Sequence, residues 1–113
     1  MELQLEKLDG NVTRAIPVGH WDVTGAAEID LKLSAVANSG CGLIIDLAKV
    51  TYISSMGVRA LILTGKAVKL KGGKMALLAP APLVEEVLGA AAIRELFPVC
   101  RSFEEARKIV SAP

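Results

Sequence analysis

The sequence is poor in the residues that most catalytic and metal-binding sites use. It contains one histidine, His20, and two cysteines, Cys41 and Cys100, in 113 residues. A structural zinc site needs a tetrahedral set of His, Cys or carboxylate ligands at short spacing, and a thioredoxin-like redox site needs a Cys-x-x-Cys motif. Neither pattern is present. We therefore expect no metal, no cofactor and no disulfide, with both thiols reduced.

The sequence also has little excess charge and no long apolar run. Thirteen Lys and Arg oppose twelve Asp and Glu, which leaves a net charge of +1, whereas binding to a phosphate backbone usually requires a clear positive excess. The segment Met1–Lys7 lacks the basic start and apolar stretch of a secretory signal. The longest apolar run, Met75–Val84, contains two prolines and has about half the length of a membrane-spanning helix. We expect a cytoplasmic protein that neither binds nucleic acid nor inserts directly into a membrane.

What the sequence does contain is typical of one packed domain. The composition is 52% hydrophobic and 22% charged, which excludes intrinsic disorder. A chain of this length buries about two-thirds of its extended surface, enough for a core without disulfides. We expect a single domain over residues 1–113.

The hydrophobic period alternates along the chain between the values typical of strands and of helices. The predicted elements are a hairpin of strands around residues 3–5 and 12–18, a helix over 24–38, strands over 42–47 and 50–53, a helix over 58–70, a strand over 75–79, and helices over 82–88 and 103–110. This order predicts an α/β fold with a mostly parallel sheet, an antiparallel N-terminal hairpin and about four helices.

Local signals define several of these boundaries. Asp9-Gly10 predicts a hairpin turn in which both residues adopt positive φ, and it places Val12, Ile16 and Val18 on one face of the second strand. Gly89 is expected to stop the third helix, and Ser102 followed by Glu105 has the spacing of a capping box.

Enzymatic activity is not expected. Ser55 and His20 could meet in space, but the string Tyr52–Gly57 lacks the Gly-x-Ser-x-Gly spacing of a nucleophile elbow, and no oxyanion motif accompanies it. A small enzyme with Ser55 or Cys41 as nucleophile stays open as an alternative from another class.

The junction before the second predicted helix is the most informative place in the sequence. Ser54 and Ser55 fall at the helix N-terminus, where free amides and the helix dipole favour an anion. A phosphoryl group there would be solvated by the amides, yet it would repel a partner pressed on the same spot. The alternative is that a serine only caps the helix, which is worth about 1 kcal/mol.

Three basic residues follow along the same helix. Arg59, Lys66 and Lys69 are spaced by seven and three residues and so share one side of the helix. This stripe is either a solvated face or a surface that docks an acidic partner.

The residues around this junction resemble the STAS domain family, which includes the bacterial anti-sigma factor antagonists. The resemblance begins with Leu43–Leu47 and Val50–Val58 and extends over nearly the whole chain. It includes Gly19–Asp22 before the first helix, the turn Lys71–Lys74, and Ser102–Ala106 in the last helix.

The resemblance implies a partner-switching cycle. In the family, a Ser or Thr at the position of Ser55 is phosphorylated by an anti-sigma factor that is also a Ser/Thr kinase. The unphosphorylated antagonist binds the anti-sigma factor and frees the sigma factor, and the phosphorylated form is released. A Ser/Thr phosphatase is a further candidate partner. The residues expected to form the partner-binding surface are Asp22, Ser54, Ser55, Met56, Gly57 and Arg59.

Two residues depart from the family pattern. Ser54 stands where the family has Asp before the phosphoacceptor, and Met56 replaces a small hydroxyl residue. Ser54 is therefore a rival acceptor for the phosphoryl group. The departures also leave an alternative open, namely a phosphorylation-independent interaction or sensor module, as in the regulatory domains of anion transporters.

Overall fold

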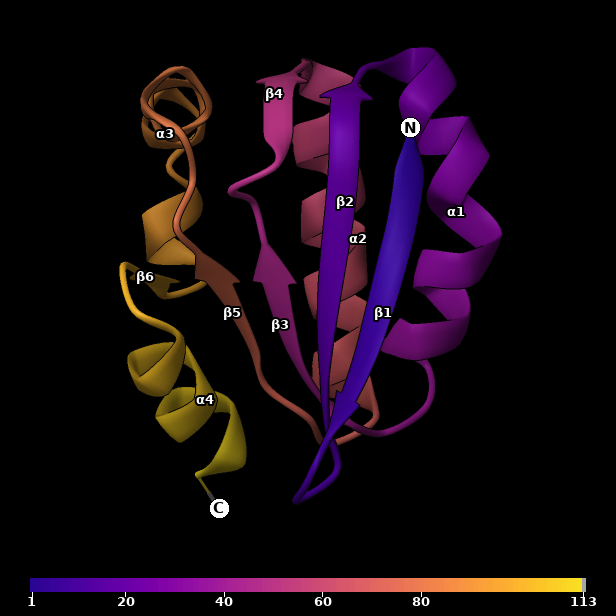
Figure 1. Ribbon diagram of the computed structural model, residues 1–113, viewed down its shortest axis with the longest axis vertical. Helices are drawn as coiled ribbons and strands as arrows, with labels where there is room; N and C mark the ends of the chain where they lie inside the picture. The colour runs from indigo at the N-terminus through magenta and orange to yellow at the C-terminus, as the bar shows by residue number, and fades with distance from the viewer. Residues whose placement is uncertain (113) are drawn as a thin grey trace.

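Strands and helices alternate along the chain as the hydrophobic period predicts. The computed structural model describes residues 1–112 (Figure 1). Its elements, in chain order, are β1 (Glu2–Leu8), β2 (Val12–Trp21), α1 (Val23–Ala37), β3 (Gly42–Asp46), β4 (Val50–Ile53), α2 (Ser55–Leu70), β5 (Met75–Leu78), α3 (Pro82–Ala90), the 3-10 turn η1 (Ile93–Glu95), β6 (Val99–Cys100) and α4 (Phe103–Ser111).

The sheet is mixed, as predicted. Its strand order is β1-β2-β3-β5-β6, with β1 antiparallel to β2 and the other pairs parallel. The long strand β2 pairs with β3 through its first half and with β4 from Gly19 to Trp21, with an irregularity between Gly19 and His20. The C-terminal ends of β2 and β4 consequently lie side by side, and each leads into a helix. The predicted α/β class with an antiparallel N-terminal hairpin and four helices is confirmed.

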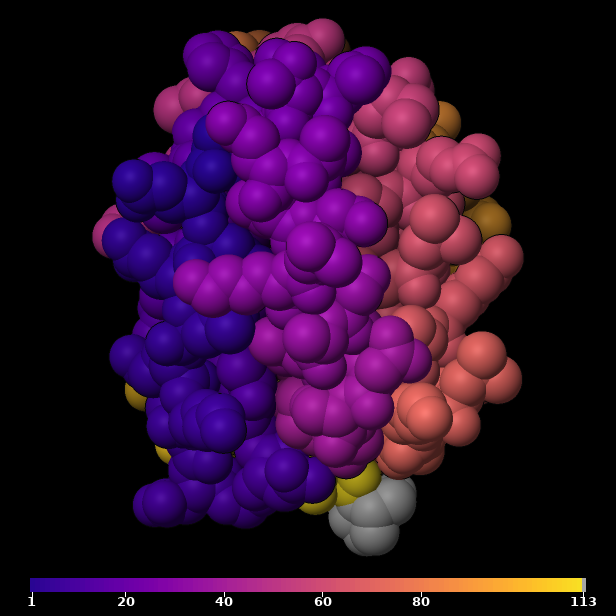
Figure 2. Space-filling model, turned by 90° about the vertical axis from the view of Figure 1, so that its right-hand side faces the viewer, coloured from indigo at the N-terminus to yellow at the C-terminus, as the bar shows by residue number. Residues whose placement is uncertain are grey.

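Helices α1 and α2 cover one face of the sheet, and α4 covers part of the other. The larger core cluster lies under α1 and α2 and includes Leu43 and Ile45 of β3. A smaller cluster joins Val12 and Ile44 to Ala106 and Val110 of α4. Figure 2 shows the outer side of the layer formed by α1 and α2, where α1 lies between β1 and α2.

The predicted apolar face of β2 is only partly buried. Val12 is buried against the α4 side, whereas Ile16 and Val18 remain partly exposed. The reason is that α4 packs at only one end of this face. The more deeply buried face of β2 is the opposite one, where Ala15 packs beneath α1 and α2.

The turn of the first hairpin differs from the prediction by one residue. Leu8 pairs with Val12, so the loop consists of the three residues Asp9, Gly10 and Asn11. The positive φ angles belong to Gly10 (79°) and Asn11 (58°) and not to Asp9. Asparagine tolerates the left-handed region, which allows the loop to be one residue longer than a two-residue turn.

Several helix ends differ as well. Helix α2 begins at Ser55, three residues before the predicted start, and α3 continues through Gly89 to Ala90. The short elements η1 and β6 were not predicted, because two or three residues carry no measurable period. At α4 the predicted cap is present, since the Ser102 Oγ accepts a hydrogen bond of 3.2 Å from the Glu105 N–H.

Both cysteines are free and buried. Burial raises the pKa of the Cys100 thiol to about 11, and the hydrogen bond and negative charge of Glu105 add to this effect. The thiolate is the reactive form of cysteine, so Cys100 is held in its unreactive state at neutral pH.

Candidate phosphorylation and partner-binding site

Two helix N-termini meet at the end of the sheet where β2 and β4 finish. Residue Trp21 ends β2, and its carbonyl oxygen accepts hydrogen bonds from both the N–H (2.9 Å) and the Oγ (3.1 Å) of Ser54. These bonds tie the β2–α1 junction to the β4–α2 junction. Asp22 and Ser54, which are distant in sequence, thus belong to one site.

Each helix of the site has a side-chain cap at its start. The Asp22 carboxylate accepts from the Gly25 N–H (2.8 Å), and the Ser54 Oγ accepts from the Gly57 N–H (3.3 Å). Serine and aspartate are comparably good N-caps. Ser54 therefore fills the capping role that an aspartate at this position would fill, and the departure from the family pattern leaves the helix start intact.

The two serines of the junction have different environments. Ser54 is partly buried, and its hydroxyl is engaged as both donor and acceptor. Ser55 is the first residue of α2, is exposed, and makes no side-chain hydrogen bond to any of residues 1–112. The accessible hydroxyl at the positive end of the α2 dipole is that of Ser55.

Most of the other predicted surface residues are exposed around Ser55. Met56 is 42% exposed, Arg59 is exposed one turn further along α2, and Asp22 is partly exposed. Gly57 differs from the prediction, because it is buried. A Cβ atom there would stand 2.7 Å from both Ile53 Cγ1 and the Trp21 carbonyl oxygen, so Gly57 allows α2 to approach the sheet and does not face a partner.

The structure gives no support to a nucleophilic enzyme. His20 is exposed at the end of β2 and has Tyr52 as its ring neighbour, with 6.0 Å between centroids. Within residues 1–112, neither Ser54 nor Ser55 shares a hydrogen bond with an imidazole. Cys41, the other proposed nucleophile, is only 3% exposed. The same residues contain no cluster of three or more His, Cys, Asp or Glu side chains placed to hold a metal.

Sequence reasoning missed Trp21, to which it assigned no role. The indole is fully buried between the two helix starts, at 0% exposure. An available signal was its position: it directly precedes the Asp22 cap and lies where the hydrophobic staple of a helix N-terminus places an apolar residue.

The different environments of the serines predict different stabilities for two alanine variants. Ser54→Ala removes the cap of α2 and a hydrogen bond to the Trp21 carbonyl, so we expect it to lower the free energy of unfolding by about 1–2 kcal/mol. Ser55→Ala is expected to change it by less than about 0.5 kcal/mol. Urea unfolding of both variants measures the difference; equal losses would contradict the assignment of Ser54 as the cap.

The fold and this junction define a STAS domain. The profile of that family, described as "STAS domain", matches residues 15–106, and the chain belongs to this family. Among curated relatives, BtrV of Bordetella bronchiseptica, provisionally named an anti-sigma factor antagonist, is 30% identical over 107 residues, which cover 94% of this chain and 91% of BtrV.

Solved structures with the same fold include other anti-sigma factor antagonists. The one from Mycobacterium paratuberculosis superposes with a TM-score of 0.88 at 21% identity, covering 98% of this chain and 94% of that one. The antagonist SpoIIAA in its unphosphorylated form gives 0.80 at 22% identity and 96% coverage of both chains. Phosphorylated SpoIIAA from Bacillus gives 0.73 at 21% identity, covering 96% and 99%. At these identities the likeness establishes the fold.

In residues 1–112, no helix is long and apolar enough to cross a membrane.

Proposed function

We propose that this protein is an anti-sigma factor antagonist that binds a kinase-type anti-sigma factor and is released when Ser55 is phosphorylated. The proposed binding face consists of Asp22, Ser54, Ser55, Met56 and Arg59. The names of BtrV and SpoIIAA support the antagonist role. The observation that carries the switch is the exposed Ser55 hydroxyl at the start of α2.

The start of α2 is suited to hold a phosphorylated side chain without unfolding. The first amides of a helix have no partner within the helix and attract an anion. Arg59 lies four residues after Ser55, a spacing that places two side chains on the same helix face. Within residues 1–112 the Arg59 side chain forms no ion pair or hydrogen bond, so its guanidinium is free to pair with the phosphoryl group.

The same modification disfavours a bound partner. A phosphoserine carries about −1.5 to −2 charges near neutral pH, and Met56 beside it is an exposed apolar residue. A partner surface that packs on Met56 would bury this charge without water. The cost of removing a charge from solvent is large unless it is paired, and the single positive charge of Arg59 neutralises only part of the phosphoryl charge, so the complex dissociates.

In this proposal the chain is a substrate and a binding protein, with no catalytic activity of its own. The anti-sigma factor is the kinase, and a Ser/Thr phosphatase returns the chain to its binding form. The cycle runs in the cytoplasm, where a sigma factor acts.

Phosphate mapping tests the proposal. The purified protein is incubated with the kinase-type anti-sigma factor of its source organism and ATP, and the modified residue is located by mass spectrometry. We expect one phosphate, on Ser55. Ser54→Ala, which keeps Ser55, should still be modified, whereas Ser55→Ala should not. Absence of phosphate on both serines would remove the switch.

A second function is favoured by one observation, the replacement of the aspartate before the acceptor by Ser54. In that case the domain is a phosphorylation-independent interaction module. The two functions differ in one result, because ATP would dissociate the complex with the anti-sigma factor in the first and leave it intact in the second.

A further inference from the structure

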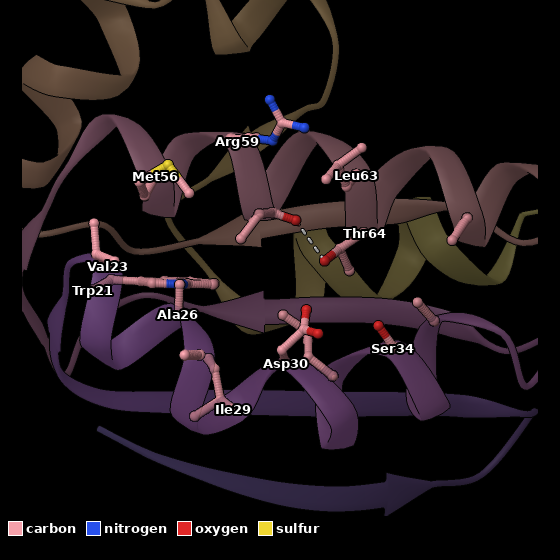
Figure 3. Close-up of a pocket in the computed structure, with 15 residues that line it drawn as sticks. Trp21, Val23, Ala26, Ile29, Asp30, Ser34, Met56, Arg59, Leu63 and Thr64 are labelled. Carbon is pink, nitrogen blue, oxygen red and sulfur yellow. Dashed lines mark hydrogen bonds between the residues drawn. The ribbon is translucent and has the colours of Figure 1, made fainter.

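A groove runs between α1 and α2 on the outer side of the helical layer. Its volume is about 490 Å³. Its walls are contributed by one face of each helix, with Trp21 at the end where both helices begin (Figure 3). Six of its fifteen lining residues are alanine or serine, namely Ala26, Ala27, Ser34, Ala37, Ala60 and Ala67.

Apolar side chains on the rim of the groove are left in water. Val23 is 63% exposed, Leu63 is 51% exposed and Met56 is 42% exposed. Met56 belongs also to the proposed binding face beside Ser55. The groove is thus continuous with the surface that phosphorylation is proposed to control.

The buried end of the groove contains an unsatisfied hydrogen-bond donor. The Trp21 Nε1 is inaccessible to water and has no hydrogen-bond partner in residues 1–112. Nearly all buried polar groups in proteins are paired, and an unpaired one costs about 1–3 kcal/mol. Since the Nε1 has no surface accessible to water, an acceptor from an occupant of the groove satisfies it only if the side chains that cover the indole move on binding.

The two sides of the groove carry opposite charges. Asp30 stands on the α1 side, with its carboxylate in the space between the helices, and Arg59 stands on the α2 side (Figure 3). In the part of the chain that the structure describes, neither side chain is engaged in an ion pair or hydrogen bond. The groove therefore offers one unpaired charge of each sign to an occupant.

The shape of the groove points to an elongated occupant. Its lining residues on α2 extend from Met56 to Ala67, a rise of about 17 Å at 1.5 Å per residue. That length matches about three turns of a helix. Small side chains on both walls allow another backbone to approach closely, and packing of an amphipathic helix into an apolar groove is a common mode of recognition.

We infer that this groove receives an amphipathic helix of the anti-sigma factor. This inference rests on the proposed function and adds a second area to its binding face. The occupant helix presents about three turns of apolar residues, an acidic residue toward Arg59, a basic residue toward Asp30, and a hydrogen-bond acceptor to the Trp21 indole.

Two groove variants and one matched control test the inference by isothermal titration calorimetry with the anti-sigma factor, without ATP. Leu63→Glu on α2 and Ala27→Glu on α1 should each weaken binding by at least about tenfold, as expected when binding buries an unpaired charge. Leu31→Glu is the control, because Leu31 is 87% exposed on α1 and lies outside the groove. It should bind within about twofold of the native protein. All three positions are exposed, and circular dichroism checks that each variant is folded; if one of the groove variants unfolds, the other decides.

The single tryptophan of the chain provides an independent readout. A ¹⁵N-labelled sample has one indole N–H cross-peak, which should shift when unlabelled anti-sigma factor binds, since its hydrogen bonding changes. Native-like binding by Leu63→Glu and Ala27→Glu, with an indole peak that does not shift, would overturn the inference that the groove binds the partner. It would leave the proposed function intact. If the native protein forms a dimer that Leu63→Glu dissociates, the occupant is a second copy and the inference is wrong. If the native protein does not bind the anti-sigma factor at all, the proposed function fails and this inference with it.

Discussion

A Ser55→Glu protein should bind the anti-sigma factor at least about a hundredfold more weakly than the native protein. The change places a carboxylate in the middle of the proposed binding face, beside the exposed Met56. A hundredfold loss corresponds to about 2.7 kcal/mol, which lies within the cost of burying an unpaired charge at an interface. The measurement is a calorimetric titration in the absence of ATP.

The same variant should be slightly more stable than the native protein. A negative charge in the first turn of a helix interacts favourably with the helix dipole, by about 0.3–1 kcal/mol, and α2 has no acidic residue in its first turn. Weaker binding together with a higher midpoint of urea unfolding would show that the added charge, and not misfolding, causes the loss of affinity.

Ser111→Glu serves as the matched control for Ser55→Glu. It adds the same charge at an exposed serine near the C-terminus, in the last turn of α4, and should leave the affinity unchanged. Native-like binding by Ser55→Glu would contradict the proposal that a charge at Ser55 controls release.

Much of the fold could be predicted because the central strands are buried on both faces. The run Gly42–Asp46 is buried at every position, and a continuous apolar run bounded by turns is the signal of such a strand. The spacing of apolar residues by three and four predicted α1, and the length and apolar content of residues 58–70 predicted α2. The turn at Asp9 shifted by one residue because its local sequence is compatible with loops of two lengths, and strand pairing from Leu8 to Val12 decides between them.

The serines of the site could be found in the sequence, whereas their surroundings could not. Ser54 and Ser55 are adjacent, and the start of a helix is a local signal. Their contact with Trp21 depends on β4 pairing with the far half of β2, a connection between residues about thirty positions apart. No local pattern reports that pairing. For the same reason Gly57 was assigned to the surface, although the neighbouring strand end buries it.

This connection also links the stability of the domain to its proposed binding face. The Trp21 backbone holds Ser54 through two hydrogen bonds, and its side chain would be 3.0 Å from a Cβ atom on Gly57. The indole therefore supports the first turn of α2 from below, directly under the residues proposed to contact a partner.

Replacing Trp21 with alanine should lower the free energy of unfolding by about 3–5 kcal/mol, the usual cost of truncating a buried aromatic side chain. The loss has a further consequence, since a cavity under α2 would disorder the Ser54 cap and the exposed Ser55. Trp21→Phe is the control: it keeps most of the apolar volume and removes the unpartnered Nε1 donor, so it should cost less than about 1.5 kcal/mol. Urea unfolding of the two variants measures both values. Similar losses for alanine and phenylalanine would show that the indole N–H is needed in the free protein, and would contradict the view that this donor waits for an acceptor from a partner.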